Sequence, residues 1–344
     1  MKIINIGKVP PPKGGVSVFI KRLKPYLDDS GLRNEFYDIS GKDITRKNAE
    51  GIFAYSPMAA FTKIFIQEKA CIFFHSNRLD VLVIAFLLKI RHKTGIFVHS
   101  ESILKKNKIY RFFLSKLDYI VTPTIPIKTE LLKQLPVLSD KIFCIPFVIF
   151  PKIIEDVKKE EIWNLKKKST YLIVGYAYDL SFYNGEDLYG VDMMIDLVYK
   201  LRDSGIDVTM VILLLNHTNE DYYKFIINKI KDYNLEEFIF IMEEDLDEAT
   251  SLFKLADVYV RPTNTDGNAF SIWESLFVNT PVVTSDVSQR PESCIVFKNR
   301  DVEDFYLKTK ETIEALSEIK IALSKREIVG NENKLIDFFK RIEK

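Results

Sequence analysis

Two acidic residues in the fragment RPTNTDGNAFSIWESLFVNTPVVTSD (residues 261–286) are the strongest candidates for chemistry in this chain. Apolar, strand-like runs flank the loop, and a helix is expected to begin near Ser271. Parallel α/β sheets bind ligands at the carboxyl ends of their strands, and a helix N-terminus points free amides and a positive dipole at anions. We therefore expect amides near Phe270 and Ser271 to bind a diphosphate, and Glu274 to accept hydrogen bonds from ribose hydroxyl groups. Asp266 would face the group attached beyond the phosphates.

A structural alternative explains part of the same fragment. Ser271 lies three residues before Glu274, which is the spacing of a capping box: the Ser caps a helix amide and the Glu bonds back to the Ser amide. That arrangement needs no ligand, but it leaves Asp266, Arg261 and Gly267 unexplained. Arg261 directly precedes a proline in an otherwise apolar strand, so we expect its side chain to have a role in the site.

The elements that must position these residues alternate between strand-like and helical patterns. With 344 residues, of which 47% are hydrophobic, the chain exceeds what one core normally organises, so two domains are expected. The strand-like runs of the first half are 2–7, 71–76, 95–100, 119–124 and 141–146. Those of the second half are 171–177, 208–215, 237–243, 257–263 and 281–286. Because stretches with helical spacing separate these runs, the pattern predicts parallel sheets covered on both faces.

The domain boundary is expected within residues 151–170, where a proline and dense charge interrupt the apolar rhythm. We predict a first domain over residues 1–150, a second over 151–330, and a terminal helix over 331–344 that packs back on the first domain. The predicted fold class is α/β, with two Rossmann-like, doubly wound domains.

The two halves carry opposite charge. Residues 1–150 contain 24 Lys and Arg against 12 Asp and Glu, a net charge of +12, whereas residues 151–344 contain 25 against 36, a net charge of −11. A basic domain attracts anionic partners, and nucleic acid, anionic lipid and a phosphorylated acceptor all meet that description. Solvated lysines with no dedicated partner are the plain alternative.

Cysteine usage and hydropathy indicate a cytoplasmic protein. Cys71, Cys144 and Cys294 match neither a disulfide framework nor a CxxC metal site, which fits a reducing compartment. The apolar run at the N-terminus is too short for a signal peptide, and residues 81–90 make up only about half of a membrane span. We therefore expect a chain that does not cross a bilayer.

Several motifs together resemble the retaining glycosyltransferases of family 4, whose GT-B architecture has two Rossmann-like domains facing each other across a cleft. Their E-x7-E signature is represented here by Asp266-x7-Glu274, followed by NTPVVTSD. KVPPPKGGVSVFIKRL (8–23) resembles the glycine loop of the first domain, and GIFVHSES places His99 where the family has a cleft histidine. VGYAYDLSFYNGEDLYGVDMM and ADVYVRPT resemble segments of the donor domain, so the similarity extends over nearly the whole chain.

The resemblance implies metal-independent transfer of a hexose from a nucleoside-diphosphate sugar to an acceptor hydroxyl, without a cofactor, in bacterial surface-glycan assembly. It implies that Asp266 orients the sugar, that His99 contacts the sugar or the acceptor side, and that Gly14 and Gly15 approach the donor phosphate or the acceptor. The acceptor would be a glycan or a lipid-linked molecule, which favours the inner face of a membrane over nucleic acid as the partner of the basic domain.

Other members of the implied donor site lie at a second strand end. The stretch from Met242 to Glu244 would approach the nucleobase, mainly through its backbone. Just beyond it, Asp245 and Asp247 match a DxD metal motif, but they fall in an acidic helix start that the helix dipole alone favours. We expect no metal site there.

The chain departs from the family where cations are usual. Tyr176 and Tyr189 stand where the family has Arg and Lys, which neutralise the donor diphosphate. Losing both costs transition-state stabilisation on the order of several kcal/mol unless another cation substitutes. Arg261, Arg290 and Lys298 are the candidates, since all three lie near the carboxyl ends of predicted strands or in the loops that follow them.

Two further function classes stay open. The two tyrosines motivate a catalytically degenerate, GT-B-like accessory subunit that binds a glycan or a partner glycosyltransferase without transfer. A sugar-nucleotide epimerase shares the architecture and would need no acceptor. His75 and His99 each precede a serine, but the absence of a GxSxG elbow argues against a Ser/His hydrolase, and we expect His75 to be structural.

Overall fold

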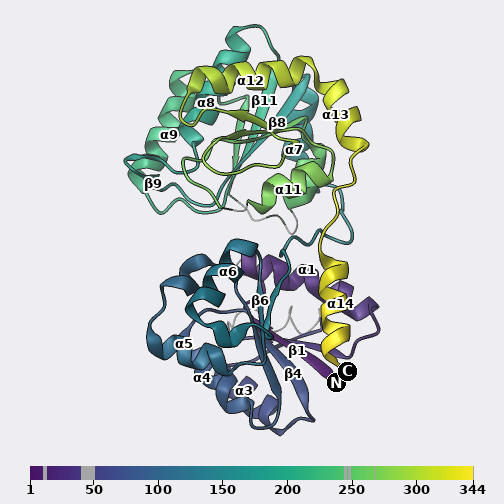
Figure 1. The fold of residues 1–344 in the computed structure, drawn as a ribbon. Helices are drawn as coiled ribbons and strands as arrows, with labels where there is room; N and C mark the ends of the chain where they lie inside the picture. Colours follow the sequence, from purple (N-terminus) through teal and green to yellow (C-terminus); the bar gives the residue numbers. More distant parts are fainter. Residues whose placement is uncertain (11–13, 40–50, 244–245, 247–248, 268, 344) are drawn as a thin grey trace. The chain divides into compact units, whose positions relative to one another are not determined.

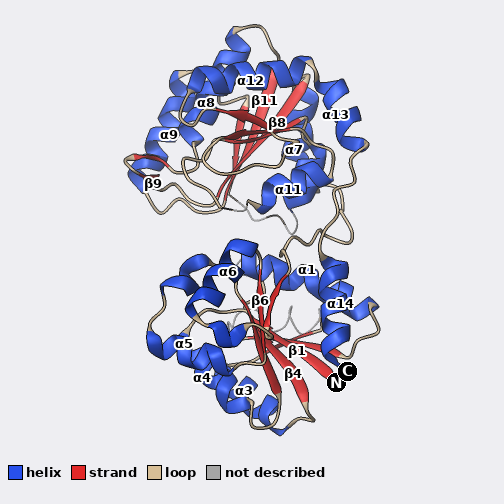
Figure 2. Ribbon diagram, in the orientation of Figure 1, coloured by secondary structure: helices blue, strands red, loops and turns tan. Residues whose placement is uncertain are grey.

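The computed structural model describes residues 1–10, 14–39, 51–243, 246, 249–267 and 269–343. The chain divides into two units, one formed by Met1–Lys152 with Gly330–Lys344 and the other by Ile153–Val329 (Figure 1). Each unit has a parallel sheet with helices on both faces (Figure 2). The predicted α/β class, with two Rossmann-like domains, is confirmed.

The first unit is built on a seven-stranded sheet in the order β3-β2-β1-β4-β5-β6-β7. Its strands are β1 (Lys2–Gly7), β2 (Asn34–Asp38), β3 (Ile52–Ala54), β4 (Ala70–Phe74), β5 (Lys93–Phe97), β6 (Tyr119–Thr122) and β7 (Ile142–Cys144). Its helices are α1 (Gly15–Asp29), α3 (Pro57–Ile66), α4 (Leu79–Leu88), α5 (Lys108–Lys116), α6 (Ile125–Gln134) and α14 (Glu332–Glu343), with 3-10 turns over Glu101–Lys105 and Pro136–Leu138.

The second unit has a six-stranded sheet in the order β12-β11-β8-β13-β14-β15. Its strands are β8 (Tyr171–Ala177), β11 (Val208–Leu214), β12 (Ile239–Met242), β13 (Val258–Arg261), β14 (Val282–Ser285) and β15 (Ile295–Phe297). A small antiparallel hairpin pairs β9 (Phe182–Tyr183) with β10 (Glu186–Asp187). The helices are α7 (Glu160–Lys168), α8 (Val191–Asp203), α9 (Glu220–Asp232), α10 (Ala249–Leu255), α11 (Phe270–Phe277), α12 (Val302–Glu314) and α13 (Leu316–Ser324).

Strand β11 shows why the central strands read as continuous apolar runs. All seven of its residues are buried, and successive side chains enter opposite faces of the sheet. Met210 and Ile212 belong to one apolar cluster, whereas Val211 and Leu213 belong to another on the other face. Each such side chain contributes roughly 1.5 to 3 kcal/mol through burial, so a polar residue at any position would weaken one of the two cores.

The strand order identifies where ligands should bind. In the second unit, β8 lies between β11 and β13, so the chain leaves β8 in one direction and returns on its other side. In the first unit, β1 lies between β2 and β4 in the same way. Such reversals open a crevice at the carboxyl ends of the two adjacent strands.

The last helix, α14, is part of the first unit. Phe338 and Phe339 pack edge-on against Phe73 of β4, with ring centroids 5.7 and 5.2 Å away. The amino group of Met1 also lies 3.2 Å from the carboxylate of Glu343. The C-terminal residues therefore complete the core of the domain that begins the chain.

All ten strands that the sequence predicts are present, with ends shifted by a few residues. The sequence did not predict β2, β3, β15 or the β9–β10 hairpin. Within the charged stretch 151–170, residues Glu160–Lys168 form α7, whose Ile162 is fully buried in the core of the second unit.

Candidate active site

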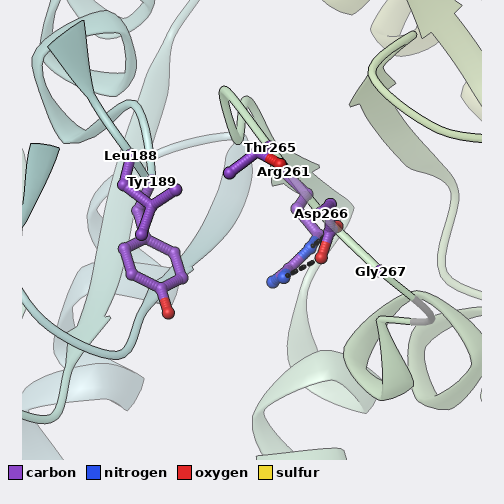
Figure 3. Close-up of a pocket in the computed structure, with 6 residues that line it drawn as sticks. All are labelled: Leu188, Tyr189, Arg261, Thr265, Asp266 and Gly267. Atoms are coloured by element: carbon purple, nitrogen blue, oxygen red, sulfur yellow. Dashed lines mark hydrogen bonds and ion pairs between the residues drawn. The ribbon is translucent and has the colours of Figure 1, made fainter. Parts of the chain in front are cut away.

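A pocket of about 380 Å³ lies at the carboxyl ends of β8 and β13, where the strand order of the second unit reverses. Leu188 and Tyr189, from the segment between β8 and α8, line one side (Figure 3). The other side is lined by residues at the end of β13 and in the loop after it: Arg261, Thr265, Asp266 and Gly267. The volume is typical of small-molecule sites.

The carboxylate of Asp266 is held by two arginines. Arg261 donates from Nε to Oδ2 at 2.7 Å and from Nη2 to Oδ1 at 3.0 Å, a bidentate pair (Figure 3). Arg290, from the segment after β14, donates from Nη1 to Oδ2 at 2.9 Å. The hydroxyl of Thr263 donates to the same oxygen at 3.3 Å. Oδ2 therefore accepts three hydrogen bonds and Oδ1 accepts one, so the acceptor capacity left for a ligand hydroxyl is on Oδ1.

The cluster of Arg261, Asp266 and Arg290 is buried and carries a net positive charge. The three side chains are 8%, 9% and 3% exposed, respectively. Burial by itself raises the pKa of Asp266, but the hydrogen bonds and charges of Arg261 and Arg290 outweigh it and hold the pKa below its ordinary value. Since arginines stay protonated, two cations face one anion, and the excess of one positive charge lies beside the pocket.

The start of α11 differs from the capping box. Ala269 occupies the N-cap position, so Ser271 is the second residue of the helix and its hydroxyl does not cap it. Instead, Ser271 Oγ accepts hydrogen bonds from the hydroxyl of Tyr259 at 2.8 Å and from Nη1 of Arg261 at 3.3 Å. The capping-box interpretation is therefore wrong, and Ser271 helps to orient Arg261. Glu274 is buried one turn further along the helix.

The segment that carries Leu188 and Tyr189 is fixed by Asp187, which sequence reasoning missed. Its carboxylate accepts hydrogen bonds from the backbone amides of residues 189–192 at 2.9 to 3.3 Å and from the hydroxyl of Tyr222 at 3.0 Å. Gly190 follows with a φ of 69°, and a Cβ there would clash with the carbonyl oxygen of Pro262. An aspartate three residues before the glycine at a helix start was the available signal. Gly190 therefore lets the two loops of the pocket approach each other.

A family model described as Glycosyl transferases group 1 matches residues 157–335, more than half of the chain, including the pocket and α11. The chain belongs to the group 1 glycosyl transferases. The predicted resemblance to a glycosyltransferase is thereby confirmed at the level of the family.

Solved structures share the fold of the chain. Anabaena HepE in complex with UDP matches with a TM-score of 0.70 and 14% identity, over 99% of this chain and 100% of that chain. Its complex with UDP-glucose matches with a TM-score of 0.67 and 14% identity, over 99% of each chain. Sucrose-phosphate synthase from Thermosynechococcus elongatus matches with a TM-score of 0.67 and 12% identity, over 100% and 98%. Identities this low establish the fold alone. No curated protein sequence matches the chain.

In this glycosyltransferase, the tyrosines that stand in place of the usual cations lie beside Arg261. The rings of Tyr176 and Tyr189 meet edge to face at 6.5 Å, and the guanidinium of Arg261 lies 6.0 Å from the ring centre of Tyr176. Burial raises the pKa of both tyrosines, so they are neutral at ordinary pH. Of the replacement cations that the sequence suggested, the structure brings Arg261 and Arg290 together, whereas the side chain of Lys298 is exposed.

Of the remaining donor-side candidates, Gly267 lines the pocket of the glycosyltransferase, whereas Phe270 and Met242 are not among its lining residues. Phe270 is the first residue of α11, and Gly267 lines the pocket without any positive φ that would demand glycine. Met242 ends β12 and is buried, while Glu244, Asp245 and Asp247 lie outside the described residues.

In the first unit, the candidates lie at the carboxyl edge of the sheet. Gly14 is the N-cap of α1 and Gly15 its first residue; both are exposed, and a Cβ at Gly14 would meet nothing within 4 Å. His99 follows β5 and is half-buried, with Nε2 3.1 Å from Nδ1 of His75. Within the described part of the chain, no helix is both long and apolar enough to span a bilayer.

Proposed function

We propose that this glycosyltransferase is a retaining, metal-independent enzyme that moves a hexose from a nucleoside-diphosphate sugar to an acceptor hydroxyl in bacterial surface-glycan assembly. The buried cluster of Arg261, Asp266 and Arg290 is the observation that carries the proposal. A net positive charge that is buried beside a pocket is stabilised when an anion enters. A diphosphate is the group that the family's donors would bring there.

Each named residue has a role in this proposal. The arginines and the first amides of α11, at Phe270 and Ser271, would bind the diphosphate. Glu274 would accept hydrogen bonds from the ribose, with Gly267 allowing close approach. Other proposed contacts follow the sequence predictions: Gly14 and Gly15 at the phosphate or acceptor, and Met242 with Glu244 near the base.

We propose that Asp266 acts on the donor mainly through its arginines. Its carboxylate accepts four hydrogen bonds from Arg261, Arg290 and Thr263, so it sets the direction in which both guanidinium groups point. Direct contact between Asp266 and the sugar, which the family resemblance implies, would use Oδ1, since that oxygen accepts only one of the four hydrogen bonds. The first acid is an aspartate here, one methylene shorter than the usual glutamate, and this favours the arginine-holding role.

The proposed transfer needs no covalent nucleophile. The bond between the anomeric carbon and the diphosphate oxygen breaks while the acceptor oxygen forms a bond on the same face of the sugar, and the acceptor proton passes to the departing phosphate oxygen. The net positive cluster stabilises the charge that develops on the diphosphate. His99 would contact the sugar or the acceptor side. Anabaena HepE, with the same fold, has been solved with UDP and with UDP-glucose, which supports a nucleotide-sugar donor.

We further propose that residues 1–150 serve the acceptor side, that residues 151–330 bind the donor, and that residues 331–344 stabilise the first domain. A glycan or lipid-linked acceptor would be reached at the inner face of the membrane, with the basic first domain against the lipid and no role for nucleic acid.

Calorimetric titration with UDP and other nucleoside diphosphates tests the donor site. We expect Arg290→Met and Glu274→Gln each to weaken binding by roughly 10- to 100-fold, because each removes a charged hydrogen-bonding group. Lys224→Ala, on the exposed face of α9, is the matched control and should bind as the parent does. Unchanged affinity in Arg290→Met, or no binding of any diphosphate by the parent, would contradict the proposal.

A second candidate function is a degenerate accessory subunit that binds a glycan or a partner glycosyltransferase. The observation in its favour is that neutral Tyr176 and Tyr189 occupy the positions of the usual cations. Sugar release from the donor by purified protein, with acceptor or water, would reject this alternative. Nucleotide binding without any turnover, together with a stable complex with an active transferase, would favour it.

A further inference from the structure

Three polar side chains form a hydrogen-bonded series at the reversal point of the first sheet. Asn5 of β1 lies with Oδ1 3.1 Å from Nε2 of His75, which follows β4. His75 Nδ1 in turn lies 3.1 Å from Nε2 of His99, which follows β5. We call Asn5, His75 and His99 the histidine network.

Hydrogen-bond chemistry gives the histidine network a direction. An amide oxygen only accepts, so His75 carries its hydrogen on Nε2 and donates to Asn5. A neutral imidazole has one N–H, so His75 Nδ1 accepts, and the hydrogen between the two rings belongs to His99 Nε2. His99 Nδ1 is consequently a lone-pair acceptor that the network does not use.

The surroundings keep both rings neutral and fixed. His75 is buried and stacks on Phe97 at 4.7 Å, and His99 packs against Phe19 and Phe147 at 5.3 and 4.8 Å. Burial, and then the neighbouring His99, lowers the pKa of His75 well below its ordinary value, and burial lowers the pKa of His99 to about 3. A protonated ring would break the donor-to-acceptor order, and at neutral pH neither ring is protonated.

Two further features of β1, at Gly7 and Asn5, are explained by the histidine network. A Cβ on Gly7 would lie 3.0 Å from the Cβ of His75, so glycine leaves room for this ring beside α1. Among the described residues, Nδ2 of Asn5 is buried without a hydrogen-bond partner. An unpaired buried donor destabilises a fold, so a strand that needed only to fill the core would favour an apolar residue at this position. The hydrogen-bond acceptor that Asn5 supplies to His75 explains why an asparagine stands at this position.

We propose that His75 and Asn5 are positioning residues that hold His99 in its Nε2–H tautomer, so that Nδ1 of His99 accepts a hydrogen bond from a sugar or acceptor hydroxyl. This inference rests on the proposed function, because it assigns a substrate hydroxyl to His99. It gives His75 a functional role in place of the structural one that the sequence suggested. An acceptor at this position orients a hydroxyl without taking charge itself.

Nitrogen-15 NMR of the full-length protein with labelled histidine reads the tautomers directly. The chain has four histidines, so each can be assigned by single substitution. We expect Nε2 of His99 to carry the hydrogen and Nδ1 to show the shift of an unprotonated nitrogen. Observation of the Nδ1–H tautomer of His99, or of a mixture of tautomers, in the parent protein would overturn the proposal.

Kinetics test whether the tautomer matters for transfer. His75→Leu removes the acceptor for His99 Nε2–H, so we expect mixed tautomers and a fall in kcat of about tenfold or more. His75→Gln offers an amide oxygen in its place and should keep the tautomer and most of kcat. His92→Gln is the matched control, since His92 is buried in the same unit and accepts a bond from the amide of Ala70 at 3.3 Å.

The outcomes separate this inference from the proposed function. Wild-type kcat in His75→Leu, with a folded protein by circular dichroism, would overturn the positioning role. A fall in kcat with unchanged UDP affinity supports it, because UDP binding reports on the second unit. Failure of the parent to bind any nucleotide would contradict the proposed function, whereas the tautomer of His99 is read without substrate.

Discussion

His75 and His99 give this protein a specific dependence of stability on pH. Both rings have pKa values far below those of an unfolded histidine, so the unfolded chain binds protons that the native state excludes. A group of this kind destabilises the fold as the pH falls below the unfolded pKa of about 6.5. The same sign applies to His92, whose pKa is lowered by burial and by Arg91.

We expect the His75→Gln/His99→Gln double variant to lose less stability than the parent between about pH 8 and about pH 5, by up to about 4 kcal/mol. Urea denaturation at each pH measures the free energy of unfolding. His92 and the carboxylates titrate alike in both proteins, so the difference isolates the pair. Parallel curves for parent and variant would show that the two rings take up protons in the native state over the same pH range as in the unfolded chain.

At the residue scale, the sequence indicated candidate site residues more readily than the residues to which they bond. Asp266, Arg261 and Glu274 were predicted as site residues from their place in one short fragment, which needs no knowledge of distant contacts. Arg290 reaches Asp266 from 24 positions away, and that pairing depends on the order of β13 and β14 in the sheet. Likewise, His75 and His99 meet because β4 and β5 are adjacent strands, so the histidine network could not be derived from local pattern.

At the scale of elements, the hydrophobic pattern predicted all the central strands except β2, and it predicted the edge strands only in part: β7 and β12 were found, whereas β3 and β15 were missed. β2 has the sequence NEFYD, in which polar residues break the apolar run, and β3 and β15 have only three residues each. The edge strands β3 and β15 have a neighbour on one side only, so they need less apolar surface than β11 does. The β9–β10 hairpin has strands of only two residues each, which is too short for hydrophobic periodicity to show, and Asn264 donates to the carbonyl oxygen of Tyr183 from a distant loop.

The start of α8 depends on one carboxylate, and this can be tested. We expect Asp187→Asn to destabilise the protein by about 1 to 3 kcal/mol, because the amide nitrogen would face backbone N–H donors that now bond to oxygen. Thermal unfolding should show a midpoint lower by about 2 to 4 °C for each kcal/mol. Asp203→Asn is the matched control, since Asp203 is exposed at the other end of the same helix. Equal midpoints for the two variants would contradict this role of Asp187.

At the scale of the whole molecule, the division into two units sharpens the charge difference. The first unit contains 29 Lys and Arg against 15 Asp and Glu, a net charge of +14, whereas the second contains 20 against 33, a net charge of −13. The segment from Arg78 to Leu117 contributes nine basic residues against two acidic ones. This segment includes α4 and α5, which pack against each other on the first unit (Figure 1).

The exposed faces of α4 and α5 combine this charge with apolar side chains. Ile90, directly after α4, is 77% exposed, and Phe112 of α5 is 53% exposed. Phe86 and Phe112 both contact Phe113, with ring centroids 5.6 and 5.4 Å apart, so the apolar residues are continuous between the helices. Apolar side chains surrounded by lysines and arginines are the pattern of a surface that lies on anionic lipid.

Vesicle sedimentation with the full-length protein tests membrane contact. We expect binding to vesicles that contain phosphatidylglycerol, weak binding to pure phosphatidylcholine, and release as salt rises. The Ile90→Ser/Phe112→Ser variant should bind about tenfold more weakly, because two partly inserted side chains are lost. Phe225→Ser/Ile321→Ser removes similarly exposed side chains from the acidic second unit and should bind as the parent does. Equal binding by the two double variants would contradict the assignment of this face to membrane contact. A dimer in solution that only the Ile90→Ser/Phe112→Ser variant disrupts would assign this face to self-association instead.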